Sequence, residues 1–252
     1  MNERVVLAYS GSPAASAAIR RLIDHDQLEV ATLTLDFGAR GDLQEIQERA
    51  MAGGAVRGHV IDVREEFADQ HLLPALQAGA LDGRAETIAA LSRPLIARKL
   101  VEVARIERAS AVAHAAAPDS GLDTLIRAID PSLRILNVHA AAASSPRVDA
   151  HRKPASIDNG AEVEITFDRD VPVAINGVPM SLTELLESLT VIAVQHGVTA
   201  AGDFAAAPAL VVLQAAFNAR SREESTTIVR LKLQHGLIGG VAVRAELVAP
   251  RS

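Results

Sequence analysis

The stretch AYSGSPAAS, Ala8–Ser16, has the residue types of an anion-binding turn. An apolar run that ends at Ala8 predicts a buried strand, and the alanine-rich segment after Pro13 predicts a helix. Backbone N–H groups and the positive end of a helix dipole meet at such a turn, where they favour phosphate or another anion. The same pattern is also typical of a plain strand-to-helix turn in which Ser12 or Pro13 begins the helix.

Three acidic residues, Asp36, Asp42 and Glu45, follow the second predicted strand. Carboxylates at the end of a strand can bind a metal ion or act as an acid and base pair. Asp42 also directly precedes a helix with apolar periodicity, and Glu45 lies three residues further on, which is the pattern of a helix N-cap. We therefore predict that Asp42 caps a helix, and we expect no metal site.

One histidine and two arginines are the remaining polar candidates. His114 ends a predicted core strand, so its imidazole either contributes to the candidate site or is buried and hydrogen-bonded in the core. The other histidines are scattered and lack the spacing of zinc ligands. Arg93 and Arg98 flank Pro94 in a long predicted helix, where they either face the anion site or form surface ion pairs.

The elements that position these residues alternate between strands and helices. This alternation is typical of βαβ units, so we predict an α/β fold with a doubly wound, mostly parallel sheet and a ligand edge at the carboxyl ends of its strands. The expected strands are Val5–Ala8, Val30–Asp36, His59–Val63, Ala111–His114 and Arg134–Val138. The expected helices are Ala14–Asp24, Leu43–Ala52, Glu65–Ala78, Ala85–Ser110 and Leu122–Asp130, with Pro94 either kinking the fourth or beginning a new one.

Periodicity is lost over residues 141–160, which are rich in Ala, Ser, Pro and charge and therefore predict a linker. We divide the chain into a nucleotide-binding-like domain at residues 1–140 and a reduced α+β domain at residues 161–252. In the second domain we expect two strands with a turn signal at Asn176-Gly177, a helix from Ser181 to His196 with Glu184 in capping-box register, a helix at Ala207–Ala219, and a hairpin that turns near His235-Gly236 or Gly239-Gly240.

The composition is that of an ordinary globular chain. The 252 residues carry 25 basic and 31 acidic side chains with no basic run, so we expect no nucleic-acid partner. The chain has no cysteine, no signal pattern at its start and no apolar stretch near the roughly 20 residues that span a bilayer, so we expect a cytoplasmic protein with no membrane partner. Aromatic residues are 2% of the chain, so a ligand pocket would lack stacking groups.

The order and wording of these segments resemble the argininosuccinate synthase family, ATP-dependent ligases with the N-type ATP pyrophosphatase fold. Nine strings carry the resemblance over most of the chain: AYSG at Ala8–Gly11, TLDFG at Thr34–Gly38, GHVIDVREEFADQHLLPAL at Gly58–Leu76, ALSRPLIARKLVEVA at Ala90–Ala104, AVAH at Ala111–His114, SID at Ser156–Asp158, PVAINGVPMSLTELL at Pro172–Leu186, HGV at His196–Val198 and VRLKL at Val229–Leu233. The family's enzymes are much longer. The resemblance implies that a central part of their second domain is missing between about Ala207 and Ser225, with much of their C-terminal tail.

The resemblance also implies a chemistry and a site. Members of the family adenylate the ureido oxygen of citrulline with ATP, release pyrophosphate and let the amine of aspartate displace AMP, which requires a pyrophosphate loop, Mg²⁺ and two bound substrates. The family's loop is S-G-G-x-D-[ST]-S; here Ser12 replaces the second glycine, Ala14 the aspartate and Ala15 the hydroxyl residue. The residues expected at the nucleotide site are Ala8, Tyr9, Ser10, Gly11, Ser12, Ser16, Leu35, Arg93 and His114. We expect ATP with Mg²⁺ to bind weakly or not at all.

Three substrate-binding elements of the family also differ here. The loop at Ala115–Thr124 lacks the family's lysine and amides, the segment Asp82–Thr87 lacks its tyrosine, and Asn159-Gly160 replaces a longer segment that contacts citrulline. We therefore interpret the chain as a catalytically degenerate homologue, a pseudoenzyme with a role in association or regulation. The alternatives are an adenylating enzyme with altered substrates and a genuine argininosuccinate synthase with compensating residues.

The segment Ala209–Phe217, ALVVLQAAF, is apolar on nearly every face of a helix. Such a helix either lies at an interface between subunits or is buried within its own chain. Because the related enzymes assemble through their second domain, we expect a homo-oligomer, either a dimer or a tetramer.

Overall fold

The computed structural model describes residues 3–38, 42–81, 85–117, 120–138, 160–198, 206–221 and 225–245. They form two compact units, one from residues 1–63 and 92–147 and the other from residues 64–91 and 148–252. The structure thus places residues 64–91 with the second unit, whereas the sequence analysis assigned them to the first domain. The physical reason is that their apolar side chains, Leu72 and Leu76 among them, belong to the core of the second unit. Apart from Gly160, the expected linker lies outside the described residues.

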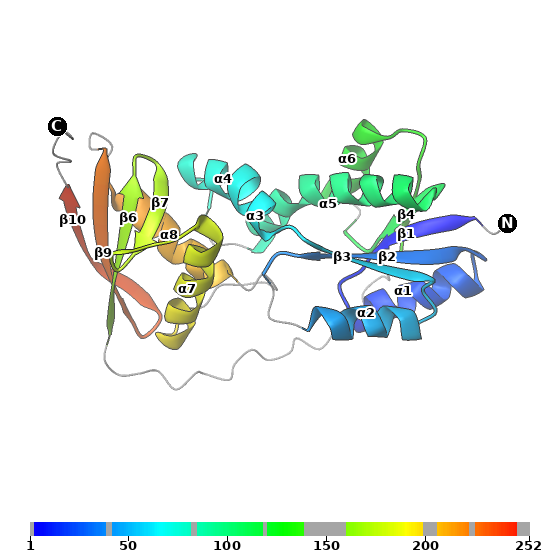
Figure 1. Ribbon diagram of the computed structural model, residues 1–252, viewed down its shortest axis with the longest axis horizontal. Coiled ribbons are helices and arrows are strands. Elements are labelled where there is room, and N and C mark those ends of the chain that lie inside the picture. The colour runs from blue at the N-terminus through cyan, green and yellow to red at the C-terminus, as the bar shows by residue number, and fades with distance from the viewer. Residues whose placement is uncertain are drawn as a thin grey trace. The chain divides into compact units, whose positions relative to one another are not determined.

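The first unit is built on a five-stranded sheet in the order β3-β2-β1-β4-β5 (Figure 1). Its strands are β1 (Arg4–Ala8), β2 (Glu29–Asp36), β3 (Arg57–Asp62), β4 (Ala111–His114) and β5 (Arg134–Asn137). Every neighbouring pair is parallel, so the carboxyl ends of all five strands lie at one edge of the sheet. The predicted α/β fold is confirmed, and each expected strand end lies within two residues of the observed one.

Helices cover both faces of this sheet, as Figure 1 shows. They are α1 (Pro13–Asp24), α2 (Leu43–Ala52), α5 (Ala85–Glu107) and α6 (Leu122–Ile129). Side chains of β1 alternate between the two faces: Val5 and Leu7 pack with the side of α1, and Val6 packs with the side of α5 and α6. Helix α5 runs through Pro94 without ending. The apolar run of β1 is therefore explained by burial on both faces.

The buried carboxylate of Glu107 binds side chains near the amino ends of two of these strands, β1 and β3, and Arg4 links this cluster to β2. The Glu107 side chain is 1% exposed and accepts hydrogen bonds from Arg4 Nη1 at 2.8 Å and Arg57 Nη1 at 3.0 Å. His59 Nε2 lies 2.7 Å from Glu107 Oε1, the same oxygen that accepts from Arg57, and Arg4 also donates to Glu29 at 2.9 Å. Burial raises the pKa of Glu107, but the hydrogen bond from His59 and the charges of its partners outweigh burial, so the pKa lies below its ordinary value.

The second unit contains a five-stranded antiparallel sheet in the order β10-β9-β6-β7-β8. Its strands are β6 (Ala161–Asp168), β7 (Val171–Ile175), β8 (Val178–Pro179), β9 (Thr226–Gln234) and β10 (Leu237–Ala245). The expectation of two strands before the first helix was incomplete, because the Asn176-Gly177 turn leads into the short strand β8. The later hairpin turns at His235-Gly236, one of the two expected places, and the other place is a bulge within β10.

Helices pack on this sheet and form the largest apolar cluster of the described residues. They are α3 (Arg64–Phe67), the π-helical turn η1 (Ala68–Leu72), α4 (Leu73–Gln77), α7 (Leu182–Gln195) and α8 (Ala207–Ala219). The predicted capping box of α7 is confirmed: Ser181 N donates to Glu184 Oε2 at 2.8 Å, and Glu184 N donates to Ser181 Oγ at 3.3 Å. None of the helices in the described ranges is both long and apolar enough to cross a membrane.

Helix α8 is buried within its own chain. Leu210, Val212 and Leu213 are each 0% exposed, and Phe217 meets Phe167 of β6 edge-on with 6.0 Å between the ring centres. Of the two explanations that the sequence allowed for this apolar helix, the structure shows burial in the core. The apolar surface of α8 is therefore no evidence for a homo-oligomer, which remains a prediction.

Candidate functional site

The candidate site is the turn between β1 and α1, at the carboxyl edge of the parallel sheet. Tyr9, the first residue after β1, is 3% exposed. Its N–H donates to Leu33 O of β2 at 2.8 Å, and its carbonyl accepts from Thr34 Oγ1 at 3.0 Å. The Tyr9 and Ser16 hydroxyls share a hydrogen bond of 2.8 Å, which ties the start of the turn to the first turn of α1. Tyr9 is thus a buried residue that stabilises the turn by hydrogen bonds, and its ring is not exposed for stacking on a ligand.

Position 11 requires a glycine for two reasons, its backbone conformation and the close approach of a side chain from α2. Its φ is +74°, in the left-handed region, and a Cβ at this position would lie 2.9 Å from Ile46 Cγ1 of α2. Arg49, one turn further along α2, donates from Nη1 to Gly11 O at 2.7 Å and pairs with Glu45 at 3.0 Å. Helix α2 therefore fixes the turn through two side chains, Ile46 and Arg49.

Ser12 caps helix α1. Its hydroxyl accepts a hydrogen bond from Ala15 N at 3.2 Å and another from Ser10 Oγ at 3.2 Å, and Pro13 occupies the first helical position. This is the strand-to-helix turn that the sequence allowed, with Ser12 as the cap. The loop hydroxyls are thus already engaged in hydrogen bonds with one another and with the helix start.

The turn still has the features of a weak anion site. Within the described residues, the N–H groups of Gly11, Ser12 and Ala14 have no hydrogen-bond acceptor, and they lie at the positive end of α1. The guanidinium of Arg49 adds a positive charge beside Gly11. Arg49 was not predicted from the sequence, because its spacing of four from Glu45 indicates an ordinary surface ion pair on a helix.

His114 is held by two hydrogen bonds at the end of β4. The residue is 1% exposed; Ala116 N donates to Nδ1 at 3.3 Å, and Nε2 lies 2.7 Å from Asp123 Oδ1. Because a backbone N–H can only donate, Nδ1 must accept, so the proton is on Nε2 and is donated to Asp123. The structure therefore shows the buried, hydrogen-bonded histidine that the sequence left as one of two interpretations.

The remaining residues that the sequence singled out lie on different elements of the first unit, and the structure does not bring all of them to the turn. Ala8 and Leu35, near the ends of β1 and β2, are partly buried on the α5 side of the sheet. Arg93 is half-buried on α5, and within the described parts of the chain it has no hydrogen bond or ion pair that would bring it to the turn. Asp42 caps α2 as predicted, accepting from Gln44 N at 2.9 Å and Glu45 N at 3.2 Å.

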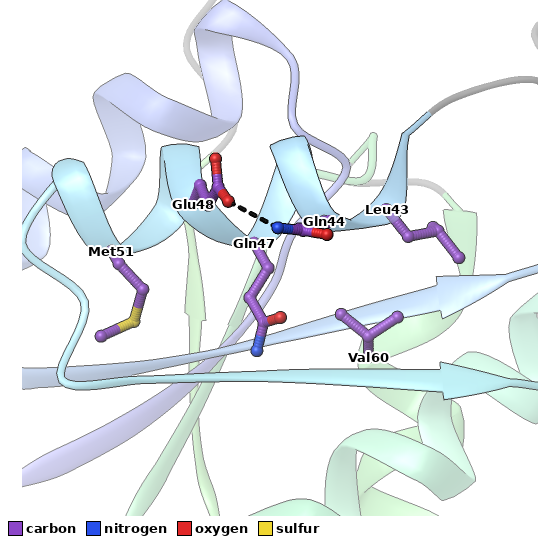
Figure 2. Close-up of a pocket in the computed structure, with 6 residues that line it drawn as sticks. All are labelled: Leu43, Gln44, Gln47, Glu48, Met51 and Val60. Carbon is purple, nitrogen blue, oxygen red and sulfur yellow. Dashed lines mark hydrogen bonds between the residues drawn. The ribbon is translucent and has the colours of Figure 1, made fainter.

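A groove of about 610 Å³ lies on a different face of α2 (Figure 2). Its lining comes from α2 and the edge strand β3 and consists of Leu43, Gln44, Gln47, Glu48, Met51 and Val60. None of the predicted site residues takes part in it. Gln44 Nε2 donates to Glu48 at 2.9 Å, so the acidic side chain among the described lining residues already has a partner.

One comparison with known protein families matches the part of the chain that contains this turn. Residues 4–142 match the family model described as the arginosuccinate synthase N-terminal HUP domain. The chain is 33% identical to the argininosuccinate synthase of Geobacillus sp. (strain WCH70) and 32% identical to that of Streptococcus thermophilus (strain ATCC BAA-491 / LMD-9). Each match covers 78% of this chain and 62% of the relative, so the chain spans less than two thirds of the relatives' length.

Among solved structures, NAD+ synthetase from Burkholderia pseudomallei covers 44% of this chain at 23% identity, but its TM-score of 0.33 adds no weight. The family model covers more than half of the chain and includes the whole β1-to-α1 turn. The chain therefore belongs to the argininosuccinate synthase family.

Proposed function

We propose that this chain is a catalytically degenerate member of the argininosuccinate synthase family, without ligase activity, whose turn at Ser10–Ser16 holds at most a small anion. One observation carries the proposal: Ala14 stands in the first turn of α1, so the loop offers no carboxylate, and the hydroxyls of Ser10, Ser12 and Ser16 are used within the turn. The retained fold then serves association or regulation rather than catalysis.

The donor set of the turn does not fit Mg²⁺. The ion prefers hard oxygen ligands in near-octahedral geometry, and carboxylates are its usual anchors in proteins. Between Ser10 and Ser16 the side chains provide hydroxyls only, each of which already has a hydrogen-bond partner. We therefore derive no reaction step that depends on a metal at this turn.

Purified protein supplied with ATP, Mg²⁺, citrulline and aspartate tests the proposal. We expect pyrophosphate release no faster than in a blank without protein, because the adenylation step needs several kcal/mol of electrostatic stabilisation that this turn does not supply. Turnover above the blank that Ser10→Ala abolishes would show an active ligase instead. A Thr183→Ala variant, changed on α7 of the other unit, is the matched control.

The alternative function is an adenylating enzyme with altered substrates. The N–H groups of Gly11, Ser12 and Ala14, which have no acceptor in the described part of the chain, favour it together with Arg49 beside them. Calorimetric titration separates the two. Under our proposal inorganic phosphate binds weakly and ATP does not bind at micromolar strength, because few contacts offset the ordering cost. Micromolar, Mg²⁺-dependent ATP binding that Arg49→Ala weakens and Arg127→Ala does not would favour the alternative.

A further inference from the structure

The groove between α2 and β3, called the α2–β3 groove below, lies apart from the candidate site. Three aliphatic side chains line it, Leu43 and Met51 of α2 and Val60 of β3 (Figure 2). Met51 is 45% exposed and Val60 is 36% exposed, so this apolar lining is in contact with solvent. Apolar side chains that gather in one hollow, rather than scatter singly over a surface, are typical of a binding site.

A contact between Gln47 and Gly58 shapes the groove. Gln47 Nε2 donates to Gly58 O at 2.8 Å, and a Cβ on Gly58 would lie 2.9 Å from Gln47 Cγ. Because Gly58 has no side chain, Gln47 can lie against β3. Leu43, Gln47 and Met51 follow one another at intervals of four residues, so they form one stripe of α2 that is about 12 Å long. An extended segment of about four residues has this length.

The polar groups of the groove favour a cation. Glu48 has the one charged side chain among the lining residues, all of which fall in the described ranges. Gln44 Nε2 donates to Glu48 and Gln47 Nε2 donates to Gly58 O, so each amide holds its nitrogen against a protein acceptor. A ligand in the groove therefore meets amide oxygens and a carboxylate, which accept hydrogen bonds and attract positive charge.

The arginines of the same two elements are held by other partners. Arg49 of α2 binds Gly11 O and Glu45, and Arg57 of β3 binds Glu107. In the part of the chain that the structure describes, neither forms an ion pair with Glu48. A partner segment can therefore supply the cation, and the stem of a lysine or arginine also packs well on an apolar lining. A second copy of the chain, with its net charge of -6, fits this groove less well.

We propose that the α2–β3 groove binds a short segment of a partner protein in which aliphatic side chains lie next to a lysine or arginine. The aliphatic side chains pack on Leu43, Met51 and Val60, and the cation pairs with Glu48 at the rim. A contact of this size is that of a transient complex rather than a permanent one. The proposal is independent of any ligase activity, because the groove and the candidate site use different faces of α2.

Fluorescence anisotropy with short labelled peptides tests the chemistry of the partner. The probe is a peptide of leucine and lysine, and two matched peptides replace its lysines by glutamate or its leucines by serine. We expect the full chain to bind the probe at least about tenfold more tightly than either matched peptide, because each of these lacks one of the two kinds of contact. Equal binding of the three peptides, or no binding of the probe at about 1 mM, would overturn the proposal.

Variants of the chain test whether the groove is the place of binding. Glu48→Lys should weaken binding of the probe about tenfold, whereas Glu102→Lys, an exposed change on α5 with the same effect on net charge, should not. Met51→Ser should also weaken binding, whereas Ile106→Ser, at an apolar side chain of α5 that is 68% exposed, should not. Circular dichroism shows that each variant is folded. Equal effects of the groove variants and their controls would contradict the assignment of the groove.

Oxidation of Met51 provides a second measurement, made on the unchanged chain. Hydrogen peroxide converts an exposed methionine to its sulfoxide, which mass spectrometry of peptides quantifies. We expect the probe to slow oxidation of Met51 in proportion to the fraction of chain bound, and to leave Met180, which packs against the core of the second unit, unchanged.

The same measurement distinguishes other occupants of the groove. Equal protection of Met51 by octylamine, which has the charge and an apolar chain but no peptide, would assign the groove to small organic amines. Protection that rises with the concentration of the chain alone would assign it to a second copy. Either result, or unprotected Met51 at saturating probe, would overturn the proposal.

Discussion

Glu107 has the largest expected effect on stability among the single residues described above. Three cationic or imidazole groups converge on its carboxylate, so Glu107→Gln removes a buried charge and leaves its partners incompletely satisfied. We expect the free energy of unfolding to fall by roughly 1–3 kcal/mol. The loss is no larger because Arg4 and Arg57 are partly exposed and can bind water instead. Tyr9 is the chain's single tyrosine, and there is no tryptophan, so tyrosine fluorescence during urea unfolding reports on the first unit.

The same carboxylate predicts a dependence on pH. The pKa of Glu107 is below its ordinary value of about 4.5, so its contribution to stability is fully present above that pH and is lost as the pH falls through the folded-state pKa.

Glu102→Gln, on the same helix but 46% exposed, is the matched control for Glu107→Gln and should change the free energy of unfolding by less than about 0.5 kcal/mol. Equal stability losses in the two variants would contradict the role of Glu107.

At the scale of elements, Ser181 fixes the start of α7. Ser181→Ala removes the hydroxyl that accepts from Glu184 N, which should cost about 1 kcal/mol. The backbone hydrogen bond from Ser181 lowers the pKa of Glu184, so the carboxylate stays charged at the positive end of the helix. During urea unfolding, far-UV circular dichroism should show the helical signal lost at a lower urea concentration than in the unchanged chain. The tyrosine fluorescence of Tyr9 should change at the same urea concentration as before. An unchanged transition, or a similar loss in Thr183→Ala, would contradict the prediction.

Elements whose signals are local were predictable from the sequence. The caps at Asp42 and Ser181 follow from one side chain and the residue three positions on, and the parallel sheet follows from the alternation of strands and helices. The π-helical turn at Ala68–Leu72 was not predictable, because its apolar spacing is also that of an ordinary helix. In the site, the cap by Ser12 was expected as one alternative, but the hydrogen bond from Arg49 to Gly11 joins residues 38 positions apart and leaves no local signal.

At the scale of the whole molecule, the chain enters the second unit twice. Residues 64–91 leave the first unit after β3, and α5 then carries the chain back into it. Six of their side chains belong to the apolar cluster that also contains Phe167 and Phe217: Ala68, Leu72, Ala75, Leu76, Leu81 and Ile88. Composition alone did not show this, since the segment has the same helical pattern as its neighbours. The packing partner, rather than the pattern, decides to which unit a helix belongs.

This arrangement predicts the behaviour of a piece that ends at residue 140. Such a piece keeps Leu72 and Leu76 but lacks the strands and helices that cover them, so an apolar surface becomes exposed. We expect it to bind the dye ANS and to associate on gel filtration, whereas the intact chain should not bind the dye. Changing Leu72 and Leu76 to Glu in the same piece should abolish dye binding, with Tyr9 fluorescence showing whether the first unit is still folded. A monomeric piece with native side chains and no dye binding would mean that residues 64–91 are covered by the first unit after all.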